Sequence, residues 1–166
     1  AVTITLAFST PVSPGDSGNP NALGGYIDLD TDQDGATGLT PFTDIFSGLP
    51  TGMGIEYFVD LFSVDSATGT VDVVDQFFGF AGTATVSFRP TSVMITIPRT
   101  VLGGDDGTLD TAALIGTLSE PNDGAPNGGH VSTIACSGGA GCPSAPATSC
   151  RAPTRARRAS LAIYDD

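Results

Sequence analysis

The sequence predicts an all-β protein: an antiparallel β-sandwich of the jelly-roll type with an irregular C-terminal tail. Many short runs rich in β-branched residues are separated by Gly, Pro, Asn and Asp, a pattern typical of strands and turns. No long window repeats apolar residues at helical spacing, so the sequence offers little support for helices. A chain of 166 residues is long enough for one domain with a core of its own.

The first strand shows the pattern most clearly. Val2, Ile4 and Leu6 alternate with threonine and alanine, as expected for a strand with one buried face. Turn-forming residues gather at 10–21 and again at 66–69, where we expect loops. The strands expected in this half of the chain are residues 1–9, 24–30, 55–64 and 70–80.

Two segments in this half carry unusual apolar residues. Residues 41–54 lack a strand pattern, and we expect them to pack as an irregular lid over an edge of the core. In the strand 55–64, Phe58 and Phe62 share a face with two acidic residues, which indicates either a covering loop or a contact surface. Phe77, near the end of the following strand, is expected to point inward.

The second half of the chain continues with short strands. A hairpin through Pro90 is expected, followed by a short turn or single helical turn at 98–102 that two glycines close. The strands expected here are residues 82–89, 92–98, 113–119 and 130–135, with 120–129 as a long loop.

The composition changes abruptly after residue 135. Ala, Gly, Ser, Pro, Cys and Arg dominate, and such a composition cannot form a core. We therefore predict a β-sandwich domain at 1–134 and a low-complexity tail at 135–166, in which 160–164 can add as an edge strand. A GC-rich gene read out of frame gives the same composition, so a native and a frameshifted origin both stay open.

The charge excludes some classes of partner. The net charge is −12, Lys is absent, and four of the six Arg lie in Arg151–Arg158. Such a surface repels nucleic acid and anionic lipid, and no apolar run is long enough to span a bilayer, so we expect neither nucleic-acid binding nor membrane insertion. The first residue is Ala1, as in a secreted chain after signal-peptide removal, although a cloned fragment begins in the same way. We expect an extracellular or cell-surface location.

An acidic loop follows the second strand. Asp30, Asp32 and Asp34 recur at every second position before Gly35, which matches the first half of a calcium-binding loop. Pro41 occupies the position at which an EF-hand has its last acid, so other ligands must complete the site, and a solvated acidic turn is the alternative. The predicted calcium ligands are Asp28, Asp30, Asp32 and Asp34. Asp28 lies outside the DxDxDG motif, and it shares with Asp60 and Asp123 the place of an unranked candidate for completing the site.

Four stretches of the chain look familiar in combination: GYIDLDTDQ at 25–33, EYFVDL at 56–61, IPRTVLGGDDG at 97–107 and APNGG at 125–129. They resemble secreted bacterial β-sandwich domains similar to the carbohydrate-binding-module-9-like and DOMON-like sandwiches, mostly of unknown function. The resemblance spans about residues 1–134. It implies an extracellular jelly-roll-like domain, and related sandwiches bind sugars or haem.

Other reactive residues give weaker patterns. The segment Pro-Gly-Asp-Ser-Gly around Ser17 is similar to the nucleophile segment of trypsin-like proteases, but the single histidine, His130, lies downstream rather than upstream, which favours a loop. Zinc, copper or haem at His130 is a further hypothesis, although Cys136, Cys142 and Cys150 lack the close pair usual in zinc sites. Three cysteines leave one without an intramolecular partner, and their pairing stays open.

We therefore predict a non-catalytic extracellular protein, stabilised by calcium, that acts in adhesion, surface or filament assembly, or ligand binding. The alternative is a secreted hydrolase or carbohydrate-active enzyme that uses acids such as Glu56 and Asp60, but no complete set of catalytic residues is present. The expected partners are a second copy of the chain, joined through sheet edges, or a polysaccharide. In the alternative to edge joining, the strand at 1–9 pairs within its own chain.

Overall fold

The computed structural model describes residues 1–133 together with the backbone of 159–165. It is mostly antiparallel strand with little helix, which confirms the predicted all-β class. Its helical elements are η1 (Gly15–Ser17), α1 (Phe42–Ser47) and η2 (Arg99–Leu102). Its strands are β1 (Val2–Phe8), β2 (Leu23–Asp30), β3 (Tyr57–Asp65), β4 (Thr70–Asp75), β5 (Phe80–Arg89), β6 (Ser92–Ile97), β7 (Asp110–Thr117), β8 (Pro121–Ala125), β9 (Val131–Ser132) and β10 (Ala159–Asp165).

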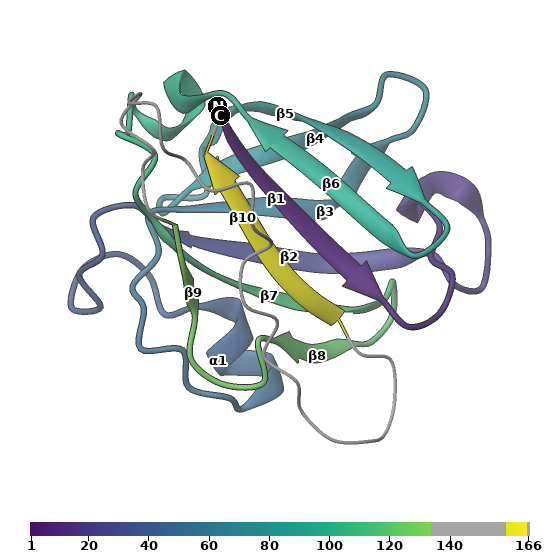
Figure 1. Cartoon of the computed structure of the whole chain (residues 1–166), viewed down its shortest axis with the longest axis horizontal. Helices are drawn as coiled ribbons and strands as arrows, with labels where there is room; N and C mark the ends of the chain where they lie inside the picture. The colour runs from purple at the N-terminus through teal and green to yellow at the C-terminus, as the bar shows by residue number, and fades with distance from the viewer. Residues whose placement is uncertain (134–158, 166) are drawn as a thin grey trace, which may run out of the picture.

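The strands form one curled antiparallel sheet. Its strand order is β10-β1-β6-β5-β4-β3-β2-β7-β8, and β9 also pairs with β7. In Figure 1, β10, β1 and β6 cross in front of β2, β3 and β7. The sheet curls far enough to bring β10 near β8 at its opposite end. The concave side of this curl encloses the main core.

Alternation along the strands builds the core. Val2, Ile4 and Leu6 of β1 are fully buried, as their spacing predicts, and they belong to one cluster with Val59 and Leu61 of β3. Each such side chain contributes about 1.5–3 kcal/mol through the apolar surface that it removes from water. The first and third strands therefore both contribute to one core the residues that the sequence pattern places inward.

The strand predicted at 70–80 ends early, at Asp75. The carboxylate of Asp75 accepts hydrogen bonds from the amides of Phe77 and Gly79, both over 2.8 Å, and this local bonding forms a turn. Phe78 takes a φ of 62° in the turn. Phe77 is therefore 83% exposed, and the prediction that it points inward is wrong.

Two segments expected to be irregular contain regular elements. Residues 41–54 include α1, and residues 120–129 include β8, which pairs with β7. Helix α1 lies over the outer face of the sheet, where Phe58 is covered and only 4% exposed while Phe62 remains 39% exposed. The covering segment expected over these two rings is therefore α1, which shields Phe58 from solvent but leaves Phe62 partly exposed.

Strand β1 is paired on both sides within its own chain. It pairs with β6 on one side and, along all seven residues, with β10 on the other. The sheet thus includes residues from the range predicted as a tail. Arg151–Arg158 and the three cysteines lie outside the described residues. In the part of the chain that is described, no helix is both long and apolar enough to cross a membrane.

Candidate metal site

The loop after β2 is ordered by its own acidic side chains. Asp32 accepts a hydrogen bond from the Asp34 amide over 3.0 Å, and Asp34 accepts one from the Ala36 amide over 3.0 Å. The Thr37 hydroxyl donates to Asp32 over 2.9 Å. Position 35, after these aspartates, requires a glycine, because a Cβ there would lie 2.4 Å from the Gly52 carbonyl oxygen. The sequence DxDxDG therefore folds into a tight loop packed against the segment that leads to β3.

Three carboxylates meet at the base of this loop. Asp30, Asp32 and Glu56 each offer one oxygen, and these oxygens all lie within 4.8 Å of one another. Calcium binds oxygens at about 2.3–2.6 Å, so two ligands on opposite sides of one ion lie about 4.6–5.2 Å apart. The three oxygens are therefore close enough together to coordinate a single calcium ion.

Strand pairing brings Glu56 into the group. Leu29 of β2 lies opposite Tyr57 of β3, so the residue after Leu29 and the residue before Tyr57 end up as neighbours. Glu56 is held there by the Thr31 amide, which donates to its carboxylate over 2.9 Å. The sequence motif did not identify Glu56 as a calcium ligand because it lies far from the loop along the chain.

Asp30 is the least satisfied member of the group. Its side chain is 1% exposed, and among the described residues its Oδ1 has no hydrogen-bond partner, while Oδ2 accepts from the Gly54 amide over 3.2 Å. Burial raises the pKa of Asp30 to about 6; hydrogen bonds from the backbone of Gly54 and Gln33 oppose the rise, and the charges of Glu56 and Asp32 add to it. A buried carboxylate oxygen without a donor, beside two further carboxylates, is an environment that a cation would neutralise.

The other predicted ligands have different environments. Asp28 is fully buried at the start of α1, where its carboxylate accepts hydrogen bonds from Phe42 and Thr43. The Asp34 carboxylate bonds within the loop. Asp60 lies on β3 and accepts from the Phe62 amide over 3.0 Å. Among the predicted ligands, the structure therefore groups Asp30 and Asp32 and leaves Asp28 and Asp34 outside the group.

The remaining sequence candidates have ordinary partners. His130 lies with Nδ1 2.9 Å from the Thr51 carbonyl oxygen and Nε2 3.2 Å from Asp110. The Ser17 hydroxyl accepts from the Asn19 amide over 3.3 Å, while the neighbouring Asp16 accepts from Ser66. The zinc, copper and haem hypotheses for His130 and the hydrolase alternative stay predictions.

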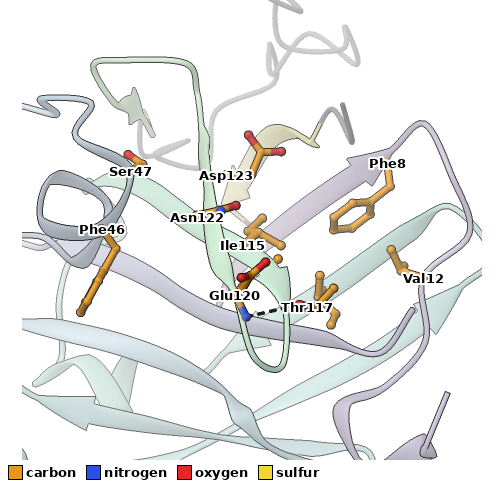
Figure 2. A pocket seen from close by; sticks show the side chains of 11 residues that line it. Phe8, Val12, Phe46, Ser47, Ile115, Thr117, Glu120, Asn122 and Asp123 are labelled. Atoms are coloured by element: carbon orange, nitrogen blue, oxygen red, sulfur yellow. Dashed lines mark hydrogen bonds between the residues drawn. The ribbon is translucent and has the colours of Figure 1, made fainter. Parts of the chain in front are cut away.

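A separate cavity of about 690 Å³ opens between β1, β8 and the end of α1 (Figure 2). In Figure 2, Phe8 and Val12 lie on one side of the cavity and Phe46 and Ser47 on the other, with Ile115 of β7 and Asn122 and Asp123 of β8 between them. Burial raises the pKa of Asp123 above its usual value. The cavity has the volume of a small-molecule site but lies apart from the three grouped carboxylates.

Comparison with known proteins adds no assignment, because no family model matches the chain and neither a curated protein nor a solved structure is significantly similar to it.

Proposed function

We propose that this protein is a non-catalytic extracellular module that binds one calcium ion through Asp30, Asp32 and Glu56, and that the ion stabilises it for adhesion, surface assembly or ligand binding. The observation that supports the proposal best is the unpartnered, buried Oδ1 of Asp30 within the three-carboxylate group. The alternating acids of the loop, read from the sequence, point to the same ion.

The chemistry of the group favours calcium over other metals. All of its ligand atoms are oxygens, which suits hard cations, whereas zinc prefers histidine and cysteine. Magnesium requires near-octahedral geometry at about 2.0–2.1 Å and releases its water reluctantly. Calcium accepts six to eight oxygens in flexible geometry, so three carboxylates, loop carbonyls and water suffice. Extracellular modules that bind calcium at about 0.1–1 mM are well known.

The ion would act as a clamp between two segments. Asp30 ends β2 and Glu56 precedes β3, and the loop carrying Asp32 lies between them in the chain. Without a cation, three carboxylates repel one another at short range. With it, the three carboxylates bind a common ion, and folding is stabilised by the free energy of binding.

Calorimetric titration and thermal unfolding test the proposal together. Calcium at about 10–100 times its Kd is expected to stabilise the folded state by about 1–3 kcal/mol, and a chelator is expected to reverse the effect. Glu56→Gln removes a charged ligand and should abolish the shift. Asp72→Asn removes the same charge on β4, outside the group, and should leave the shift unchanged. An unchanged wild-type melting temperature with calcium would refute the site.

Self-association is a further part of this proposal. Assembly through sheet edges has to use strands other than β1, because β6 and β10 already pair with both of its edges. Light scattering across a concentration series, with calcium present, measures the mass of the species in solution. A mass that rises with concentration supports a role in assembly, and a constant monomer mass removes it.

A further inference from the structure

The outer face of the sheet carries a continuous row of aromatic rings. Tyr26 of β2 stacks on Phe42 of α1, with ring centroids 4.2 Å apart, and Phe42 continues to Phe46 at 6.5 Å. On its other side Tyr26 meets Phe62 of β3 edge-on at 5.4 Å. Both ends of the row reach solvent, since Phe46 is 57% and Phe62 39% exposed. The row therefore offers exposed ring surface at two places on one face.

These exposed rings line a groove. It has a volume of about 390 Å³ and lies between the aromatic row and the turn that joins β7 to β8. Gly24 makes room for the ring of Phe62, which lines the groove, because a Cβ at residue 24 would lie 2.6 Å from that ring. The groove is lined by the rings of Tyr26, Phe46 and Phe62 and by the polar side chains of Ser119, Glu120 and Asn122.

The polar side of the groove is rich in hydrogen-bond acceptors. Ser119, Glu120 and Asn122 each carry a side-chain oxygen, and Glu120 adds a full negative charge. No lining residue is cationic. Burial raises the pKa of Tyr26, and the negative charge of Asp60 adds to the rise, so Asp60 contributes negative charge on the sheet side. Among residues 1–133 the lysine and arginine side chains are Arg89 and Arg99 alone, within a chain of net charge −12. The groove therefore attracts cations.

We propose that this groove binds the guanidinium group of an arginine side chain presented by a partner protein. A guanidinium is flat and stacks on aromatic faces, and its five N–H groups donate to carboxylate, amide and hydroxyl oxygens. A quaternary ammonium has no N–H donors and leaves these oxygens unused. A neutral sugar also bonds to the oxygens but gains little from the negative charge. The inference names a ligand for the binding role proposed above, through residues that do not belong to the calcium group.

NMR titration of the full ¹⁵N-labelled chain tests the proposal with two short peptides. One is acetyl-Gly-Arg-Gly-amide, and the other carries citrulline, a neutral isostere, in place of arginine. The arginine peptide is expected to shift amides around Tyr26 and Glu120 with a Kd of about 1–10 mM, and the citrulline peptide to bind at least about fivefold more weakly. Equal binding of the two peptides, or no saturable shift up to about 20 mM, would overturn the proposal.

Variants locate the binding. Glu120→Gln, Phe46→Ala and Phe62→Ala each remove an exposed group of the groove and should weaken binding of the arginine peptide about threefold or more. Phe46 and Glu120 also line the 690 Å³ cavity, whereas Phe62 lines the groove and not that cavity. Phe80→Ala removes a ring that is 68% exposed on β5, outside the groove, and should change nothing. If Phe80→Ala weakens binding as much as Phe46→Ala, the attraction is unspecific and the proposal fails. Maltotriose that shifts the same amides more strongly than the arginine peptide would identify a sugar site instead.

The same titration is repeated with a chelator and with Glu56→Gln. Arginine binding that persists in both, while calcium no longer raises the melting temperature of the variant, shows that the groove acts without the ion. Loss of the calcium effect in wild-type protein refutes the calcium site alone. Loss of arginine binding under every condition refutes the groove alone.

Discussion

The amide and the hydroxyl of Thr43 both donate to one carboxylate oxygen of Asp28, over 2.9 and 2.8 Å. The other oxygen of Asp28 accepts from the Phe42 amide over 3.2 Å. Asp28 is fully buried on β2, and Thr43 is fully buried in the first turn of α1. A carboxylate of the sheet therefore caps the start of the helix that supplies Phe42 and Phe46 to the aromatic row, because the N-cap residue Pro41 makes no side-chain hydrogen bond.

Removing this carboxylate should destabilise the fold. Asp28→Ala leaves the buried amide and hydroxyl of Thr43 without acceptors, and we expect a loss of about 3 kcal/mol in the free energy of unfolding. Thr43→Val keeps the hydrogen bond from the backbone amide to Asp28 and loses the one from the hydroxyl, so we expect the free energy of unfolding to fall by about 1 kcal/mol. Urea denaturation measures both. Equal stability of Asp28→Ala and wild type would show that the cap contributes nothing.

Burial raises the pKa of Asp28 to about 6, and the charge of Asp44 adds to the rise, although the hydrogen bonds from Thr43 and Phe42 oppose it. The folded state thus holds this proton more tightly than the unfolded state, in which the pKa is 3.8. The contribution of Asp28 to stability is therefore greatest below pH 4 and falls as pH rises to about 6, by up to about 3 kcal/mol. Urea denaturation of the chelator-treated protein between pH 4 and pH 7 should show a smaller decline in Asp28→Asn than in wild type. Parallel curves would contradict the prediction.

Gly25 should not tolerate a side chain. Its φ is 132°, and a Cβ would lie 2.0 Å from the Leu114 carbonyl oxygen, in the pairing of β2 with β7. Gly25→Ala should therefore cost more than about 3 kcal/mol or prevent folding. Gly48→Ala is the matched control, since its φ is 69° and nothing lies within 4 Å of a Cβ, and it should cost about 1–2 kcal/mol. Similar melting temperatures of the two variants would disprove the steric argument.

Deleting residues 134–166 removes β10 and exposes an edge of β1. The exposed strand keeps a row of unpaired backbone groups, which are free to pair with another chain. We expect the shortened protein to be less stable and to associate in light-scattering measurements. Adding Thr5→Lys on this edge should restore a monomer, because edge lysines oppose strand addition. A stable monomer without the lysine would show that β10 does not protect this edge.

The sequence predicts those parts of the fold in which local pattern decides. Alternation identifies β1 and the hairpin of β5 and β6, because each has one apolar face. It misses β8, whose residues Pro121–Ala125 show no alternation and pair because β7 lies beside them. The acidic loop is visible locally, whereas Glu56 joins Asp30 only through the register of β2 with β3. The register of Leu29 with Tyr57 places Glu56 beside Asp30, so the pairing of these two strands is the information that identifies Glu56 as a candidate calcium ligand.

The pairing of β1 with β10 also bears on the order of folding. The residues of β10 follow their partners in β1 by 151 to 163 residues, so this ladder is among the least local contacts that a chain of this length can make. During synthesis at about 5–20 residues per second, one side of β1 waits about 10–30 s for its partner. The nascent chain therefore displays an open edge with alternating apolar residues throughout that interval, and a chaperone that masks short extended segments would act on β1.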